Sequence, residues 1–300
     1  MNPVICVGAA IVDNSFHCLD EPQPGTSNPA KHSRSAGGVA RNIAHSLAQL
    51  GDPVELITHF GSDADGTWLK SQCVSVGIGV THSRTTLART GQFAGIITPS
   101  GELYTGAAET HLEDEITIPF LSDQLPFLKS ARIILLDCNL NIPCIAWLLD
   151  LCRAVNLPCI IEPVSAGKAS RLRDLDLRGV LLITPNTAEL SAIGGDSRPE
   201  SLLDRGVLSV WMRKGRDGSQ LISAEETITL PAPEIRITDT TGAGDAALAG
   251  WIHGQLRGKS RRECMVYGHA LAQLILQTTG AHSARLTAEL LETTVESLKI

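Results

Sequence analysis

The sequence predicts an α/β protein built on a parallel sheet, and three observations carry this prediction. Short apolar runs recur along the chain, with helix-like spacing of apolar residues between them, as in successive βαβ units. The run at residues 132–137 is almost entirely apolar, which is typical of a central parallel strand covered on both faces. With 43% hydrophobic and 19% charged residues, the 300-residue chain can bury a full core.

The predicted elements alternate along the chain. Apolar runs predict strands at 4–12, 54–60, 93–98, 132–137, 158–162, 180–184 and 207–212. Helical spacing predicts helices at 38–50, 143–155, 245–256 and 263–277. Two stretches break the alternation: residues 14–36 are rich in proline, and residues 86–112 mix strand-like pieces with glycines. They predict a small β-structured flap over the mouth of a single domain spanning 1–300, because no linker divides the chain.

The composition excludes several partners. A net charge of −7, with 25 Lys and Arg in no long run, argues against a nucleic-acid polymer, although a single nucleotide or nucleoside stays compatible. No apolar stretch reaches 18 residues and the N-terminus has no basic leader, so we expect a cytoplasmic protein without a membrane segment. The eight cysteines form no CxxC pair, and we expect them to be reduced, buried thiols.

The segment with the most chemical information is 239–245, Asp-Thr-Thr-Gly-Ala-Gly-Asp, which leads into a helical pattern. Glycines at a helix start leave backbone N–H groups open, and the helix dipole favours an anion there. Asp245 falls in the first turn, where it can cap the helix or accept the proton of an attacking hydroxyl. An ordinary Asp suffices as the base of a phosphoryl transfer, because positioning and charge stabilisation carry most of that catalysis. The segment alone leaves both roles open.

A second segment, 37–44, reads Gly-Gly-Val-Ala-Arg-Asn-Ile-Ala. The glycine pair opens a predicted helix whose buried side carries Ala44, Leu47 and Leu50. Asn42 lies in its first turn, where the amide can bond a sugar hydroxyl as donor and acceptor, or simply pack. This segment alone also leaves both roles open.

Together the two segments resemble the two signatures of the ribokinase-like (PfkB) family of carbohydrate and nucleoside kinases, in the expected order. The resemblance covers essentially the whole chain. It implies a three-layer α/β/α sandwich with a small β-sheet lid, formed by the stretches at 14–36 and 86–112. It implies an ATP-dependent kinase whose catalytic base is Asp245 and whose anion hole is formed by Gly242, Ala243 and Gly244. It also assigns the sugar-binding positions to Asp13, Gly37, Gly38 and Asn42.

The resemblance further implies ATP, Mg²⁺ and K⁺ as cofactors. Asn186 and Glu189 match a motif that organises Mg²⁺ and phosphate through water, although alone they read as a helix cap and a solvated acid. The monovalent-cation loop falls on Asp239, Thr241, Gly280 and Ser283. The nucleotide contacts fall on Lys168, Asn186, Lys214, Gly215, Gly242 and Gly244.

One departure from the family pattern concerns the nucleotide. The family usually has a Thr-Leu-Gly-like turn where this chain has Arg213-Lys214-Gly215. The two cations could contact phosphate or face solvent, which leaves individual ATP contacts in this turn open.

Three further segments bear on the substrate: Ser-Asn-Pro at 27–29, Asp-Cys-Asn at 137–139, and Glu-Pro-Val-Ser with a following lysine at 162–168. They are similar to the branch of the family that phosphorylates pseudouridine in bacteria. That branch has Asp where this chain has Glu162, a longer acid near the expected phosphate and metal.

This similarity implies that the 5′-hydroxyl of pseudouridine is the acceptor. Asn28 would read the uracil edge, Asn139 would contact the substrate, and Lys168 would pair with the transferred phosphate. Ribose or another nucleoside is an alternative acceptor, since ribose-binding residues would be shared. A non-catalytic sugar-binding module is an alternative of another class, against which the intact 242–245 loop argues. The resemblance also implies a homodimer joined through the lid sheets.

Overall fold

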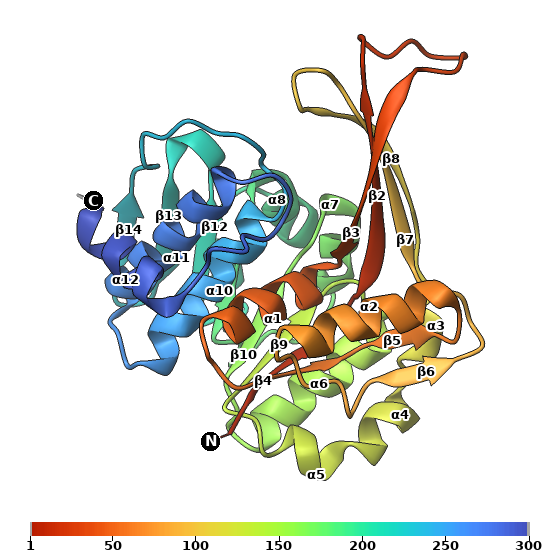
Figure 1. The fold of residues 1–300 in the computed structure, drawn as a ribbon. Helices are drawn as coiled ribbons and strands as arrows, with labels where there is room; N and C mark the ends of the chain where they lie inside the picture. Colours follow the sequence, from red (N-terminus) through yellow and green to blue (C-terminus); the bar gives the residue numbers. More distant parts are fainter. Residues whose placement is uncertain (1, 299–300) are drawn as a thin grey trace.

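An eight-stranded sheet forms the centre of the molecule (Figure 1). In the computed structural model, which describes residues 2–298, the strand order is β14-β13-β12-β11-β10-β9-β1-β4. The strands from β4 to β12 are parallel, and β13 and β14 extend the sheet as an antiparallel meander. Their bounds are β1 (Val4–Val7), β4 (Val54–Ile57), β9 (Ile133–Asp137), β10 (Cys159–Glu162), β11 (Leu182–Ile183), β12 (Ser209–Arg213), β13 (Ser219–Ser223) and β14 (Thr227–Leu230).

Helices cover both faces of this sheet, which confirms the predicted three-layer sandwich. Alternate strand residues enter two separate cores: Val4 and Cys6 of β1 join one, and Ile5 and Val7 join the other. The first core takes side chains from α1 (Val39–Gln49), α2 (Ala64–Ser75), α10 (Ala243–Leu256), α11 (Arg261–Leu276) and α12 (Ala288–Ser297). The second takes them from α3 (Leu112–Glu115), α4 (Ile118–Asp123), α5 (Leu125–Leu128), α6 (Ile142–Ala154), α7 (Ala166–Ala169), α8 (Thr187–Gly194) and α9 (Glu200–Leu203).

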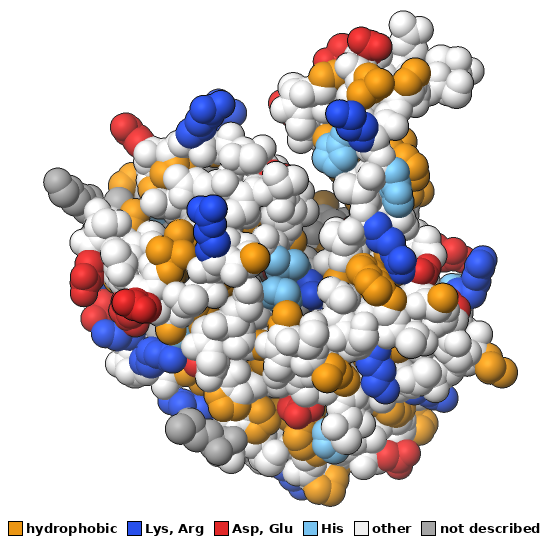
Figure 2. All heavy atoms as spheres, in the orientation of Figure 1, with side chains coloured by type: hydrophobic (Ala, Val, Ile, Leu, Met, Phe, Trp, Pro, Cys, Tyr) orange, Lys and Arg blue, Asp and Glu red, His pale blue; other side chains and the backbone are white. Residues whose placement is uncertain are grey.

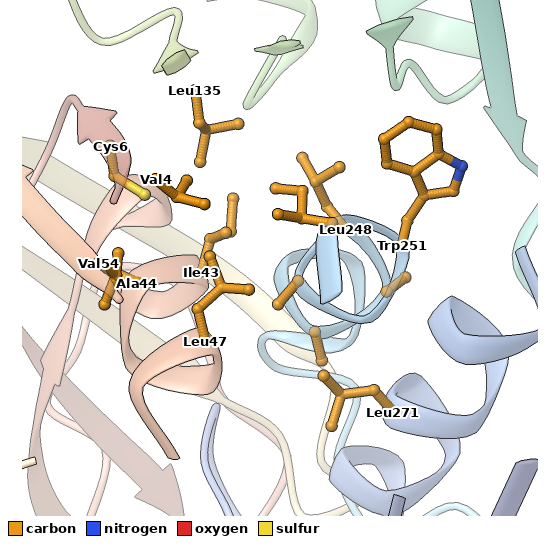
Figure 3. Close-up of a cluster of buried hydrophobic side chains, with 14 of the residues drawn as sticks. Val4, Cys6, Ile43, Ala44, Leu47, Val54, Leu135, Leu248, Trp251 and Leu271 are labelled. Carbon is orange, nitrogen blue, oxygen red and sulfur yellow. The ribbon is translucent and has the colours of Figure 1, made fainter. Parts of the chain in front are cut away.

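The first core joins the two helices that carry the site described below. Figure 3 shows Ile43 and Leu47 of α1 beside Leu248 of α10, next to Val4 and Leu135 of the sheet. All five side chains are almost completely buried. Each such side chain contributes about 1.5–3 kcal/mol of hydrophobic stabilisation. This packing fixes the N-terminus of α1 beside that of α10.

A separate four-stranded sheet, which we call the small sheet, projects from the body as an arm (Figure 1). Its order is β3-β2-β7-β8, with β2 (Ile11–Cys18), β3 (Ala30–Gly37), β7 (Gln92–Ile97) and β8 (Leu103–Glu109). These strands draw mainly on the two stretches, 14–36 and 86–112, for which the flap was predicted. The predicted strand at 93–98 is therefore β7 of the small sheet and not part of the central one.

Two strand predictions were wrong in their extent. The predicted strand 4–12 is two strands, because the chain turns at Gly8 and passes from the central sheet into the small sheet. A Cβ atom at Gly8 would collide with the Asp137 carboxylate, so only glycine allows this tight passage. Asp13, which directly follows the predicted strand 4–12 in sequence, consequently lies inside β2 and not after a strand end. The predicted strand 54–60 likewise breaks into β4 and β5 (His59–Gly61), and β5 pairs with β6 (Arg84–Thr86).

The remaining elements are two short 3₁₀ turns, at Ser170–Leu172 and Gly215–Asp217. All eight cysteines are free and buried, as predicted. Within residues 2–298, none of the helices has both the length and the apolar character needed to span a bilayer. The ends of the predicted single domain, residue 1 and residues 299–300, lie outside the described residues.

Candidate active site

Several residues that the sequence analysis named lie where the parallel strands of the central sheet end. Asn139 follows β9, Glu162 ends β10, Asn186 follows β11 and Arg213 ends β12. The carboxyl edge of an open parallel sheet is the usual binding region of α/β proteins. The first turn of α10 meets this edge, since the charges of Glu162 and Arg213 act on Asp245.

Asp245 and Asn42 are in direct contact. The Asn42 side-chain amide donates to Asp245 Oδ2 at 2.8 Å, across 203 residues of sequence. Asp245 lies in the first turn of α10, which begins after Gly242 in the left-handed region at φ 73°. Burial raises the pKa of Asp245 from 3.8 to about 7, against the opposing effect of the Asn42 hydrogen bond, and the charge of Glu162 raises it further. A carboxyl group with this pKa can take up a proton near neutral pH.

The glycine pair before α1 brings the helix close to the end of β1. Gly38 precedes α1 with φ 96°, and a Cβ atom there would collide with the Ala9 carbonyl oxygen. The Arg41 backbone N–H donates to that same carbonyl at 3.2 Å. This close approach sets Asn42 in the first turn, within reach of Asp245.

Asp13 reaches the same place from the small sheet. Its carboxylate lies against Gly37, where a Cβ atom would collide with it. Burial raises the pKa of Asp13 to about 6, while the Arg41 guanidinium opposes that shift. The structure therefore brings together Asp13, Gly37, Gly38, Asn42 and Asp245, from three distant parts of the sequence.

Asp137 holds three segments of the site together, a role that the sequence analysis did not assign to it. It is fully buried, and its carboxylate accepts hydrogen bonds from the backbone N–H groups of Ala9, Ala40 and Asn139 at 2.9, 3.0 and 2.9 Å. It thus ties the β1 turn, the start of α1 and the end of β9 to one another. A charged residue at the end of an otherwise apolar buried strand was the available signal.

Asn139 and Lys168 contact each other, the Lys168 ammonium bonding the Asn139 side-chain oxygen. Arg171 donates to the Asn139 backbone carbonyl at 3.2 Å and to that of Leu140 at 2.6 Å. Asn139 is buried, with Lys168 bonding its side-chain oxygen and Arg171 bonding its backbone carbonyl.

Glu162, Glu189 and Arg213 form a buried charged cluster. Arg213 Nη2 lies 2.7 Å from Glu162 Oε1 and 3.9 Å from Glu189 Oε2. Thr184 Oγ1 donates to the other Glu162 oxygen at 2.6 Å. The chain after Glu162 passes through Val164 at φ 73°, a rare conformation for a β-branched residue and one that clusters at functional sites.

Asn186 and Glu189 form a capping box at the start of α8. Asn186 Oδ1 accepts from the Glu189 N–H at 3.0 Å, and Glu189 Oε2 accepts from the Asn186 N–H at 2.9 Å. The capping role is thus present, but Glu189 is only 4% exposed and is not a solvated acid. Burial raises the pKa of Glu189, and the charge of the nearby Glu162 raises it further.

Within residues 2–298, no three His, Cys, Asp or Glu side chains are arranged to hold a metal ion directly.

The Arg213-Lys214-Gly215 turn divides into a buried and an exposed part. Arg213 points inward, whereas Lys214 is exposed and donates to Gln220 Oε1 at 3.1 Å. Gly215 begins the exposed 3₁₀ turn at φ 57°. The two cations therefore have different surroundings.

The loop assigned to a monovalent cation is drawn together by Asp239. Its two oxygens accept from the N–H groups of Thr241 and Gly280, each at 2.8 Å. Although burial opposes it, these bonds lower the pKa of Asp239. Ser283 is buried in the same segment as Gly280, and its hydroxyl accepts from the Arg285 N–H at 3.3 Å.

Asn28 lies apart from the residues above, in the loop at the tip of the small sheet (Figure 1). Its side-chain oxygen accepts from the Gln23 N–H at 2.9 Å, and its amide donates to the Gln23 carbonyl at 3.1 Å. In this conformation Asn28 holds its own loop.

Comparison with known proteins assigns the chain to a family. Residues 1–288 match the model of the pfkB family of carbohydrate kinases. The chain is 30% identical over 299 residues to a pseudouridine kinase from Escherichia coli, covering 95% of this chain and 91% of that one. It is 26% identical to a ribokinase from Arabidopsis thaliana, covering 93% of this chain and 77% of that one.

Solved structures agree with this assignment. A carbohydrate kinase from Agrobacterium tumefaciens superimposes with a TM-score of 0.86 at 28% identity, covering 99% of this chain and 97% of that one. An Arabidopsis thaliana ribokinase complexed with ribose and ATP superimposes with a TM-score of 0.82 at 22% identity, covering 99% of both chains. The fold is therefore ribokinase-like, and this chain belongs to the pfkB family of sugar and nucleoside kinases.

Proposed function

We propose that this kinase transfers the γ-phosphoryl group of ATP to the 5′-hydroxyl of pseudouridine, giving pseudouridine 5′-phosphate and ADP. The observation that carries the phosphotransfer is the Asp245 carboxylate, held by Asn42 at the start of α10 with its pKa raised to about 7. The acceptor hydroxyl would give its proton to Asp245 as it attacks phosphorus. The backbone N–H groups around Gly242, Ala243 and Gly244 would hold the phosphoryl oxygens.

The charged cluster is suited to the nucleotide and its metal. Glu162 and Glu189 converge on one guanidinium, so their oxygens can bind water molecules of a hydrated Mg²⁺, which usually keeps several of its waters. Mg²⁺ would supply charge neutralisation on the phosphates. We assign Lys168, Asn186, Lys214 and Gly215 to the nucleotide, and the Asp239 loop with Thr241, Gly280 and Ser283 to K⁺.

The sugar would bind between the body and the small sheet, which we propose acts as a lid. Figure 2 shows the small sheet standing away from the body, with a hollow between them on this face. Asp13 lies at the base of this sheet and Asn42 in the body, so they can hold ribose hydroxyls from two sides.

A nucleoside, more than a free sugar, is favoured by an aromatic ring on the small sheet. Phe93 is paired with Asp13 in the β2–β7 register, so both side chains lie on one face of the sheet. A Cβ atom at Gly106 would lie 2.6 Å from the Phe93 ring, and one at Gly95 would lie 3.0 Å from it. The half-buried ring therefore lies close to two glycines, a position from which it could stack on a base.

Pseudouridine is supported over uridine by the identity to the Escherichia coli pseudouridine kinase over nearly the whole chain. The pseudouridine ring has an N–H that uridine lacks, and a site that bonds it leaves a polar group unpaired when uridine binds. Asn28 is the candidate for this contact if its loop closes over the base, which requires its bonds to Gln23 to be exchanged for bonds to the substrate.

The test is a substrate panel with ATP and Mg²⁺ that covers pseudouridine, uridine, adenosine, ribose and fructose. We expect pseudouridine to give the highest kcat/KM, with phosphorus NMR locating the new phosphate at the 5′ position. The Asn28→Ala variant should narrow the gap between pseudouridine and uridine. A preference for ribose or adenosine would contradict the substrate assignment and leave the kinase assignment intact.

We further propose a homodimer joined through the small sheets, in a reducing, cytoplasmic compartment that suits eight free buried thiols. Sedimentation of the purified chain would test the dimer, and a monomer at micromolar concentration would contradict it.

A further inference from the structure

Arg213 lies between the acidic cluster and the anion-binding loop. Its side chain is 17% exposed, and Nη2 is bonded to Glu162. Nη1 lies on the other side, 2.7 Å from the position that a Cβ atom at Gly244 would occupy. In this position the guanidinium occupies space that a side chain at residue 244 would need, so it lies directly against the start of α10.

The charges around Arg213 are unbalanced. Glu162 and Glu189 contact it, and the charges of Arg213 and Asp245 act on each other. One guanidinium thus interacts with three carboxyl groups. Its charge therefore acts beyond the ion pair with Glu162. Among the described residues its side-chain hydrogen bonds run through Nη2, which leaves Nη1 directed at the loop.

The position of the guanidinium is fixed from both ends. Arg213 is the last residue of β12, and its backbone N–H donates to the Pro185 carbonyl at 3.0 Å. Glu162, which holds Nη2, is itself held by Thr184 at 2.6 Å. A cation that is already positioned loses little entropy when it meets developing charge.

We propose that Arg213 is a catalytic residue whose Nη1 donates to an oxygen of the γ-phosphoryl group during its transfer. The inference rests on the proposed phosphotransferase function and adds a charge-stabilising contact to it. The substrate oxygen bonds to the γ-phosphorus, and the bond from phosphorus to the β–γ bridging oxygen breaks with its electron pair staying on ADP. The proton of the hydroxyl passes to Asp245. Arg213 stabilises the negative charge on the equatorial oxygens, which a forked, permanently charged guanidinium does well.

The rival role for Arg213 is indirect. Its positive charge lowers the pKa of Asp245, so its removal could slow the reaction merely by keeping Asp245 protonated. That effect disappears at high pH, where Asp245 is ionised without help. A lost contact to the phosphoryl group persists at every pH.

The experiment compares Arg213→Gln with wild type and with Arg216→Gln, a matched control that removes an exposed arginine three residues away. Turnover of the fastest acceptor in the panel is measured from pH 6 to pH 9. We expect Arg213→Gln to lower kcat by about 10²–10³-fold at the pH plateau, the usual effect of losing one transition-state donor. KM for the acceptor should stay within about twofold, since no substrate contact is removed, and Arg216→Gln should match wild type.

A second measurement does not depend on turnover. Calorimetry with the full chain and Mg²⁺ compares ADP with a non-hydrolysable ATP analogue. Arg213→Gln should weaken binding of the analogue and spare ADP, because only the analogue carries the γ group. Recovery of kcat to the wild-type value at pH 9, or equal losses for both nucleotides, would overturn the proposal. If no acceptor in the panel is phosphorylated, the proposed function fails while the calorimetry still decides the role of Arg213.

Discussion

Replacing Asp245 by Asn should remove activity and, at the same time, stabilise the fold. Desolvation of the half-buried Asp245 carboxylate, together with the charges of Glu162 and Asp137, raises its pKa from 3.8 to about 7. A shift of about three units corresponds to about 4 kcal/mol of cost to the folded state once the group is ionised. Solvent that reaches the carboxylate and relaxation of its surroundings reduce this cost. We therefore expect the free energy of unfolding of Asp245→Asn to exceed that of wild type by roughly 1–3 kcal/mol at pH 8. Asn is nearly the same size and can still accept from Asn42.

The pH dependence of this gain has a definite sign. Below the unfolded pKa of an Asp, near 3.9, the group is protonated in both states and the substitution changes little. As pH rises towards about 7, the unfolded chain is ionised while folded Asp245 still holds its proton, so the cost of the carboxylate grows. Above about 7 both states are ionised, and the cost stays constant.

The assay is urea unfolding of wild type and Asp245→Asn at pH 5.5 and pH 8, alongside turnover. Turnover should fall by at least about 10²-fold, the lower range for losing a general base. The stability gain should be larger at pH 8 than at pH 5.5. Asp239→Asn is a control with the opposite expected sign. Two backbone N–H bonds lower the pKa of Asp239, so removing its negative charge should destabilise the fold at pH 8. A destabilised Asp245→Asn at pH 8, or near-normal turnover, would refute the reasoning.

Three further substitutions test the residues around Asp245. Asp13→Ala should weaken sugar binding by about 1–3 kcal/mol while sparing ADP, as measured by calorimetry; equal losses would point to misfolding instead. Asn42→Ala should weaken sugar binding by a similar amount and move the midpoint of the kcat/KM profile above about 7, because the Asn42 bond lowers the pKa of Asp245; an unmoved midpoint contradicts this. Gly38→Ala should lower the free energy of unfolding by at least about 1–3 kcal/mol, since φ is 96° and the Cβ atom would collide with Ala9. An unchanged midpoint of urea unfolding would contradict this prediction.

Local patterns in the sequence were enough to predict the fold class and two helix starts of the candidate site. Apolar runs predicted the parallel strands of the central sheet, and helical spacing predicted α1, α6, α10 and α11, because burial of one or both faces makes apolar residues recur at regular intervals. The glycine-rich loop before Asp245 and the glycine pair before Asn42 marked two helix starts, which the structure has at α10 and α1. These features are local, so a single sequence contains them.

Long-range packing decided what the patterns could not. The run 4–12 is continuous in sequence, yet the Asp137 carboxylate packed against Gly8 marks where the chain leaves the central sheet and enters the small one. Lys214 and Arg213 are neighbours of equal charge, and only the fold directs Arg213 inward between Glu162 and Gly244 while leaving Lys214 exposed to solvent.

By itself, then, the sequence determined the α/β class, the position of Asp245 directly after a glycine-rich loop, and the residue types that a phosphotransferase needs. Tertiary structure alone decided that Asn42 bonds Asp245 across 203 residues, and that burial raises the pKa of that carboxyl to about 7. The physical reason is that helix starts and strand faces are set by residues close in sequence. Desolvation and electrostatic coupling instead depend on groups that come together only when distant elements pack.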